Sequence, residues 1–85
     1  MEIFYPSGVC PHSIQFDVAS DGTIRNVCFE GGCNGNAQAI AKLVEGRPAD
    51  ATAALLAGIR CGENPTSCPD QLAKALGRYL QRKAE

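Results

Sequence analysis

Five cysteines in a chain of 85 residues are the side chains best suited to chemistry. Four of them fall at the expected ends of secondary-structure elements: Cys10 before a strand, Cys33 before a helix, Cys61 after a helix and Cys68 at the start of the last helix. Loops allow sulfur atoms from distant segments to converge, and the unpaired amides of a helix start stabilise a thiolate. The placement therefore favours a metal site built from these four cysteines.

The spacing of the cysteines leaves their chemistry open. The sequence has no Cys-x-x-Cys pair, so neither a zinc ribbon nor a thioredoxin-type redox pair is present. Six residues separate Cys61 from Cys68, a looser arrangement than zinc fingers use. On spacing alone, a four-thiolate site and scattered free thiols are both compatible with the sequence. Cys28 lies within an expected strand and is predicted to be a packed small hydrophobic residue.

Two polar side chains close to the cysteines have alternative roles. His12 could complete a metal site as a further ligand, although a lone exposed histidine at a strand start is the commoner case. Asp70 is expected in the first turn of the last helix, where a carboxylate favours the helix dipole. A role for Asp70 as a hydrogen-bond acceptor near Cys68 is the alternative. The glycine-rich segment 31–36 lacks the lysine of a phosphate-binding loop and is expected to fold tightly around Cys33.

Composition excludes several classes of function. The chain is 45% hydrophobic and carries a formal net charge of −1, whereas binding to nucleic acid or to an anionic membrane needs a basic surplus. No secretory signal and no apolar run of membrane-spanning length is evident. The expected location is therefore the cytoplasm. In a reducing compartment, many cysteines indicate metal binding or thiol chemistry before structural disulfides.

The elements that must position the cysteines follow from periodicity. Segment 2–5 is a short extended piece, and segment 13–18 alternates apolar and polar residues. The Asp21-Gly22 pair predicts a hairpin turn. Strand 24–30 is then expected to place Val27 and Phe29 on one face, with Ile24 and Cys28 on the other.

Three helices are predicted in the rest of the chain. The third begins near Cys68-Pro69 with Thr66 or Ser67 as its N-cap. The residues expected to face inward are Ala37, Ile40, Ala41, Leu43 and Val44 in the first helix, Ala51, Leu55 and Leu56 in the second, and Leu72, Ala75, Leu76, Tyr79 and Leu80 in the third. The predicted fold is α+β: a small antiparallel meander of two to three strands followed by three helices, in a single domain spanning residues 1–85.

Specific motifs make the chain resemble the TSCPD domain family. The naming motif is present as Thr66-Ser67-Cys68-Pro69-Asp70. Further matches lie along nearly the whole chain: Gly8-Val9-Cys10, Gly31-Gly32-Cys33 with Gly35-Asn36, Gly46, Gly58-Ile59, Cys61-Gly62 and Gln71-Leu72-Ala73. The likeness is greatest to the short stand-alone branch of the family. Cys28 and His12 are outside the pattern.

The resemblance also implies a biological setting. The same domain is a C-terminal module of adenosylcobalamin-dependent ribonucleoside-diphosphate reductases, and 85 residues cannot supply the barrel and the nucleotide sites of such an enzyme. The resemblance therefore implies an accessory role beside a ribonucleotide reductase and not independent catalysis.

A more distant likeness is to IscU/NifU-type iron–sulfur scaffolds, in which Cys10, Cys33 and Cys68 have counterparts. The scaffold aspartate after the first cysteine falls at His12, and the scaffold histidine before the last cysteine falls at Ser67. Cys61 has no scaffold counterpart and could replace the missing ligand. This likeness implies an IscU-like arrangement of strands and helices, and an iron–sulfur delivery protein as a partner.

The leading hypothesis is a small metal-binding module that holds zinc or an iron–sulfur cluster through Cys10, Cys33, Cys61 and Cys68. One alternative is a thiol–disulfide redox protein that cycles Cys61 and Cys68. A second alternative is an interaction module that does not depend on metal.

Overall fold

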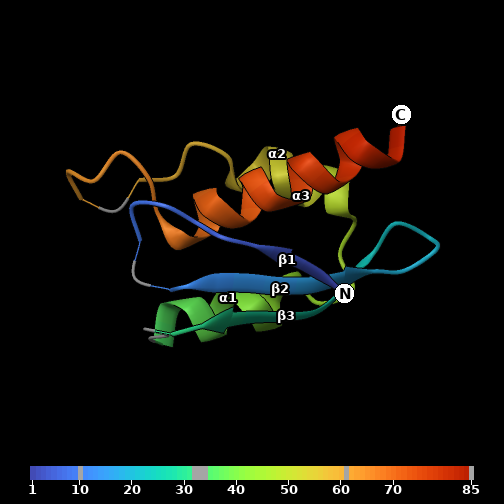
Figure 1. Ribbon diagram of the computed structural model, residues 1–85, viewed down its shortest axis with the longest axis horizontal. Helices are drawn as coiled ribbons and strands as arrows, with labels where there is room; N and C mark the ends of the chain where they lie inside the picture. Colours follow the sequence, from blue (N-terminus) through green and yellow to red (C-terminus); the bar gives the residue numbers. More distant parts are fainter. Residues whose placement is uncertain (10, 32–34, 61, 85) are drawn as a thin grey trace.

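The computed structural model describes residues 1–9, 11–31, 35–60 and 62–84, and these contain three strands followed by three helices (Figure 1). The elements are β1 (Glu2–Phe4), β2 (Ser13–Val18), β3 (Ile24–Glu30), α1 (Gly35–Val44), α2 (Ala49–Leu56) and α3 (Cys68–Ala84). The strands form one antiparallel sheet in the order β1-β2-β3. The predicted α+β fold, an antiparallel meander followed by three helices, is confirmed.

The turn between β2 and β3 has the predicted chemistry. Gly22 has a φ of 86°, in the left-handed region that glycine tolerates. Asp21 Oδ1 accepts hydrogen bonds from the backbone N–H of Thr23 at 3.1 Å and from its hydroxyl at 2.6 Å. The turn is closed by the Ala19 N–H, which donates to the Thr23 carbonyl at 2.8 Å. These bonds fix the register of the hairpin.

One face of the sheet forms the hydrophobic core. Phe4, Ile14 and Phe29 lie opposite one another on the three strands, and all three side chains are buried. The cluster is completed from the three helices by Ala37, Val44, Ala49, Leu72, Ala75 and Leu76. The next row, Ile3, Gln15 and Cys28, lies on the opposite and more exposed face. The alternation of a half-buried sheet thus decides which side chains of these two rows face the core.

A β-bulge changes the expected faces of β3. Gln15 pairs with Cys28 but Asp17 pairs with Arg25, so β3 holds one residue more than β2 across this interval. Asn26 takes up the extra residue with a φ of 57°. As a result Ile24 and Phe29 both face the core, and the prediction that Ile24 shares a face with Cys28 is wrong.

The structure also corrects the environment of Cys28. This residue is exposed on β3, and its Sγ lies 3.8 Å from Glu30 Oε1. The prediction that Cys28 packs as a small hydrophobic residue is wrong, because Cys28 alternates with the core-facing Phe29 and so lies on the exposed face of the sheet.

The inward faces of the helices follow the predicted periodicity in part. All five predicted positions of α3 are buried or pack against the core. In α1, however, Leu43 is 67% exposed. In α2, Leu55 is 76% exposed and Ala51 is also exposed, while Leu56 packs against the core as predicted. The packed residues of α2 are Ala49, Thr52, Ala53 and Leu56, which share one side of a helix with 3.6 residues per turn.

None of the helices in the described ranges is both long enough and apolar enough to cross a membrane. The longest, α3, is amphipathic: its core side is apolar, and its last turn carries Arg82 and Lys83.

Candidate functional site

Ser67 defines the start of α3, the helix that carries Cys68. Its hydroxyl oxygen accepts a hydrogen bond from the Asp70 N–H at 3.2 Å, which is the N-cap interaction expected of serine. The same hydroxyl donates to the Ile59 carbonyl at 2.6 Å. Ser67 therefore caps the helix and ties the chain that follows α2 to the start of α3.

Asp70 is buried beside this cap, with 6% of its surface exposed. Its carboxylate accepts hydrogen bonds from the Thr66 hydroxyl at 2.6 Å and from the Gly58 N–H at 2.7 Å. The Thr66 hydroxyl, followed by the Gly58 amide, lowers the pKa of Asp70 below its ordinary value of 3.8, against the effect of burial. The ion pair with Lys74, at 3.9 Å, acts in the same direction. Asp70 is thus an ionised acceptor that holds two neighbouring segments.

Gln71 extends the contacts to the N-terminal segment. Its side chain is 2% exposed, and its amide nitrogen donates to the Thr66 hydroxyl oxygen at 2.8 Å. Its amide oxygen accepts from the Ser7 N–H at 3.3 Å. We call the hydrogen-bonded side chains of Thr66, Ser67, Asp70 and Gln71 the motif network. Every one of these side chains is buried and bonded, as buried polar groups must be.

Asn64 provides a second link between the same segments. Its side-chain nitrogen donates to the Gly8 carbonyl at 2.9 Å, and its side-chain oxygen accepts from the Thr66 N–H at 3.3 Å. Gly8 has a φ of 77°, and a Cβ there would approach Thr66 Cγ2 to 2.9 Å. Only glycine fits this contact without strain.

A contact between His12 and Gly31 joins the residue before β2 to the residue after β3. The His12 N–H donates to the Glu30 carbonyl at 2.6 Å, which extends the pairing of β2 with β3. Gly31 has a φ of 73°, and a Cβ at this position would clash with Cδ2 of the His12 ring. The His12 ring therefore lies directly against Gly31.

Of the four predicted metal ligands, the structure describes one. Cys68 is the first residue of α3 and is partly buried against the core. Cys10, Cys33 and Cys61 lie outside the described residues. Within the described ranges, no three or more His, Cys, Asp or Glu side chains are grouped to hold a metal ion.

Sequence reasoning missed the contributions of Gln71 and Asn64. Gln71 was expected only as part of a motif, and nothing in its local pattern indicates that its amide reaches Ser7, which is 64 positions away. One available signal was composition: the polar residues that cluster at the start of the last helix must be either exposed or hydrogen-bonded. Here these residues are buried and bonded.

These observations define a small α+β protein. Its three-stranded meander is followed by three helices, and a buried polar network lies at the start of the last helix. The TSCPD domain family matches residues 3–80, which is most of the chain, and the protein belongs to that family. No curated protein and no solved structure matches the chain. Thr66, Ser67 and Asp70 of the family's naming motif all belong to the motif network. Their hydrogen bonds give these three motif residues a structural role.

Proposed function

We propose that this protein is a small metal-binding module in which Cys10, Cys33, Cys61 and Cys68 are the ligands. Thiolates are soft donors that select zinc or an iron–sulfur cluster. Four of them around one ion or cluster leave no open position, so the site holds its metal and does not activate a substrate.

The contacts between the segments next to these cysteines support the proposal. His12, two residues after Cys10, lies against Gly31, two residues before Cys33. Gly8, two residues before Cys10, is bonded to Asn64, which lies between Cys61 and Cys68. The tie from Ile59 to Ser67 joins the chain before Cys61 to the residue before Cys68.

These contacts lie at one end of the molecule. In Figure 1 the starts of β2, α1 and α3 and the connection before α3 all lie toward the left. The described segments next to the four cysteines therefore lie toward the same end of the long axis of the molecule, which a shared site requires.

The position of Cys68 suits a thiolate ligand. It occupies the first turn of a helix of 17 residues, where unpaired amides and the helix dipole stabilise negative charge. A metal held there would also stabilise the fold, because metal binding can contribute about 10 kcal/mol to the folding of small zinc modules. The structural role is the one we favour.

A thiol–disulfide function for Cys61 and Cys68 is the second candidate. The observation that favours it is the motif network, which ties Gly58 and Ile59, shortly before Cys61, to the start of α3, where Cys68 lies. A low-pKa thiol at a helix start is also the attacking group in such chemistry. In this case Cys10 and Cys33 are dispensable.

The setting that we propose is the cytoplasm, where thiols stay reduced. The partner would be a ribonucleotide reductase or an iron–sulfur delivery protein, with this chain as an accessory module. The distant likeness to IscU/NifU-type scaffolds is part of this proposal, because it favours an iron–sulfur partner. An interaction module that works without the thiols is the remaining alternative.

Single Cys→Ser substitutions at all five cysteines test the proposal. Purified under anaerobic conditions, Cys10→Ser, Cys33→Ser, Cys61→Ser and Cys68→Ser should each lose bound metal and cooperative thermal unfolding. Cys28→Ser is the matched control and should keep both, because Cys28 is exposed on β3. Retention of metal and of the melting transition in Cys33→Ser would contradict the four-thiolate site. A disulfide between Cys61 and Cys68 that forms equally well in Cys33→Ser would favour the redox function.

A further inference from the structure

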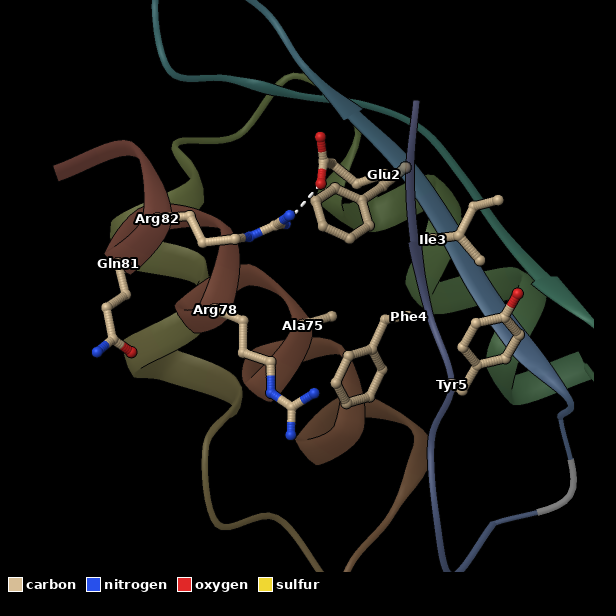
Figure 2. A pocket seen from close by; sticks show the side chains of 9 residues that line it. Glu2, Ile3, Phe4, Tyr5, Ala75, Arg78, Gln81 and Arg82 are labelled. Atoms are coloured by element: carbon tan, nitrogen blue, oxygen red, sulfur yellow. Dashed lines mark hydrogen bonds and ion pairs between the residues drawn. The ribbon is translucent and has the colours of Figure 1, made fainter. Parts of the chain in front are cut away.

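A groove separate from the motif network runs between β1 and α3. Its volume is about 400 Å³, and its walls include Phe4 and Glu2 from β1 and Ala75, Arg78 and Arg82 from α3 (Figure 2). Figure 2 shows Glu2, Phe4 and the two arginines turned into the groove, while Ile3 and Tyr5 point to the other side of β1. The groove therefore has a charged wall on the helix and a strand along its other side.

The charged wall offers hydrogen-bond donors to an anion. Arg82 pairs with Glu2, with 2.6 Å between Nη2 and Oε1. The guanidinium carbon of Arg78 instead lies 5.0 Å from the centre of the Phe4 ring. No carboxylate of the described residues lies within ion-pair distance of Arg78. A guanidinium stacked on an aromatic ring keeps its in-plane N–H groups available for a carboxylate.

The strand along the groove is an open edge. β1 is the outer strand of the sheet and pairs only with β2 among the described strands. Beyond that pairing, no hydrogen bond to the backbone of residues 2–5 is found in the described part of the chain. Open edges of this kind are where extended peptides add a strand.

The side of β1 that faces away from α3 is apolar and exposed. Ile3 is 52% exposed and Tyr5 is 75% exposed. A strand added beside β1 would place every second side chain next to these two residues and the others next to Arg78. The groove therefore favours an occupant in which acidic and apolar side chains alternate.

We propose that β1 binds an extended acidic segment of a partner protein, which adds to the sheet as a fourth strand. Acidic side chains of the segment face Arg78 and Arg82, and apolar side chains between them cover Ile3 and Tyr5. Charge complementarity identifies this occupant, because the groove presents two arginines and one carboxylate. The proposal uses none of the cysteines, so it stands or falls independently of the metal site.

Binding of a synthetic peptide tests the proposal. The probe alternates glutamate and valine over about six residues, enough to span β1 and Tyr5 at the rise of a strand. Isothermal titration should detect binding that weakens with added salt. Arg78→Gln should weaken it by about tenfold or more. Lys42→Gln, which removes an exposed cation on α1, is the matched control and should bind as the wild type does.

Two modified peptides separate the backbone contribution from the charge contribution. Methylation of the amide nitrogens on alternate residues blocks strand addition, so one of the two methylated registers should abolish binding. A peptide with lysine in place of glutamate should not bind.

Three results would overturn the proposal. The first is that the glutamate–valine peptide does not bind at about 1 mM protein. The second is that Arg78→Gln, with its helical content unchanged, binds the peptide as tightly as the wild type does. The third is that the two methylated peptides bind equally well. A concentration-dependent dimer in analytical ultracentrifugation that excludes the peptide would show that a second copy of this chain occupies the edge instead.

Discussion

Thr66 is the residue that joins the two halves of the motif network. Its hydroxyl donates to Asp70 and accepts from Gln71, so one side chain connects the cap of α3 to the N-terminal segment through Ser7. The hydroxyl is buried, and its removal would take one hydrogen bond from the Asp70 carboxylate and leave the Gln71 side-chain nitrogen without its acceptor.

Thr66→Val should therefore destabilise the protein while it keeps the shape of the side chain. We expect the free energy of unfolding to fall by about 1.5–3 kcal/mol, the range for a buried hydrogen bond to a charged group. Thr23→Val is the control, because its hydroxyl bonds Asp21 on the exposed turn, and the loss there should stay below about 1 kcal/mol. Denaturant unfolding of both variants gives the comparison, and equal losses would mean that the motif network does not hold the fold.

The turn carboxylate of Asp21 gives a prediction about pH. The Thr23 hydroxyl, followed by the Thr23 backbone N–H, lowers the pKa of Asp21 below its ordinary value of 3.8. A carboxyl group whose pKa is lower in the folded state stabilises the fold above its unfolded pKa, and that stabilisation disappears as the pH falls through the folded value.

Titration of the Asp21 carboxyl carbon by NMR should thus give a midpoint below 3.8. Thr23→Val should raise this midpoint toward the ordinary value, because the hydroxyl is the larger cause. In acid, wild-type stability should decline relative to that of Asp21→Asn as the pH drops below about 3.8. A midpoint that Thr23→Val leaves unchanged would contradict the assigned cause.

At the scale of elements, periodicity predicted the existence and order of the strands and helices but not every face. Ile24 was assigned to the wrong face because a bulge inserts one residue, and alternation in a single strand cannot reveal what its partner lacks. Helical spacing of the apolar residues predicted Leu43 and Leu55 to face inward, but both are exposed, and the packed side of α2 includes Thr52 instead. Hydrophobicity alone does not identify a core position when a small helix offers apolar residues on two sides.

The bulge itself can be tested at Asn26. A left-handed φ of 57° is tolerated by asparagine and glycine but is strained for a β-branched residue. Asn26→Val should cost about 1–3 kcal/mol of unfolding free energy, whereas Asn26→Gly should cost much less. Both variants lose the amide bond to Asp17, so their difference in urea unfolding reports the backbone conformation. Equal stabilities would show that Asn26 does not adopt the left-handed conformation.

For the whole molecule, the sequence predicted the α+β fold and the start of α3 at Cys68, both of which the structure confirms. The long-range ties could not be predicted, because the contact of Gln71 with Ser7 and that of Asn64 with Gly8 depend on how the elements pack. The four-cysteine site stays a prediction, with Cys68 the only proposed ligand among the described residues.

We propose that the segments held together by the motif network and by the contact of His12 with Gly31 form a metal site. The most direct measurement is the metal and sulfide content of the protein after anaerobic purification, with an absorption spectrum and a thiol count. The four-thiolate site predicts about one zinc per chain without visible absorption, or iron and sulfide with visible charge-transfer bands. Protein that is fully folded, carries no metal and has all five thiols reactive would contradict it.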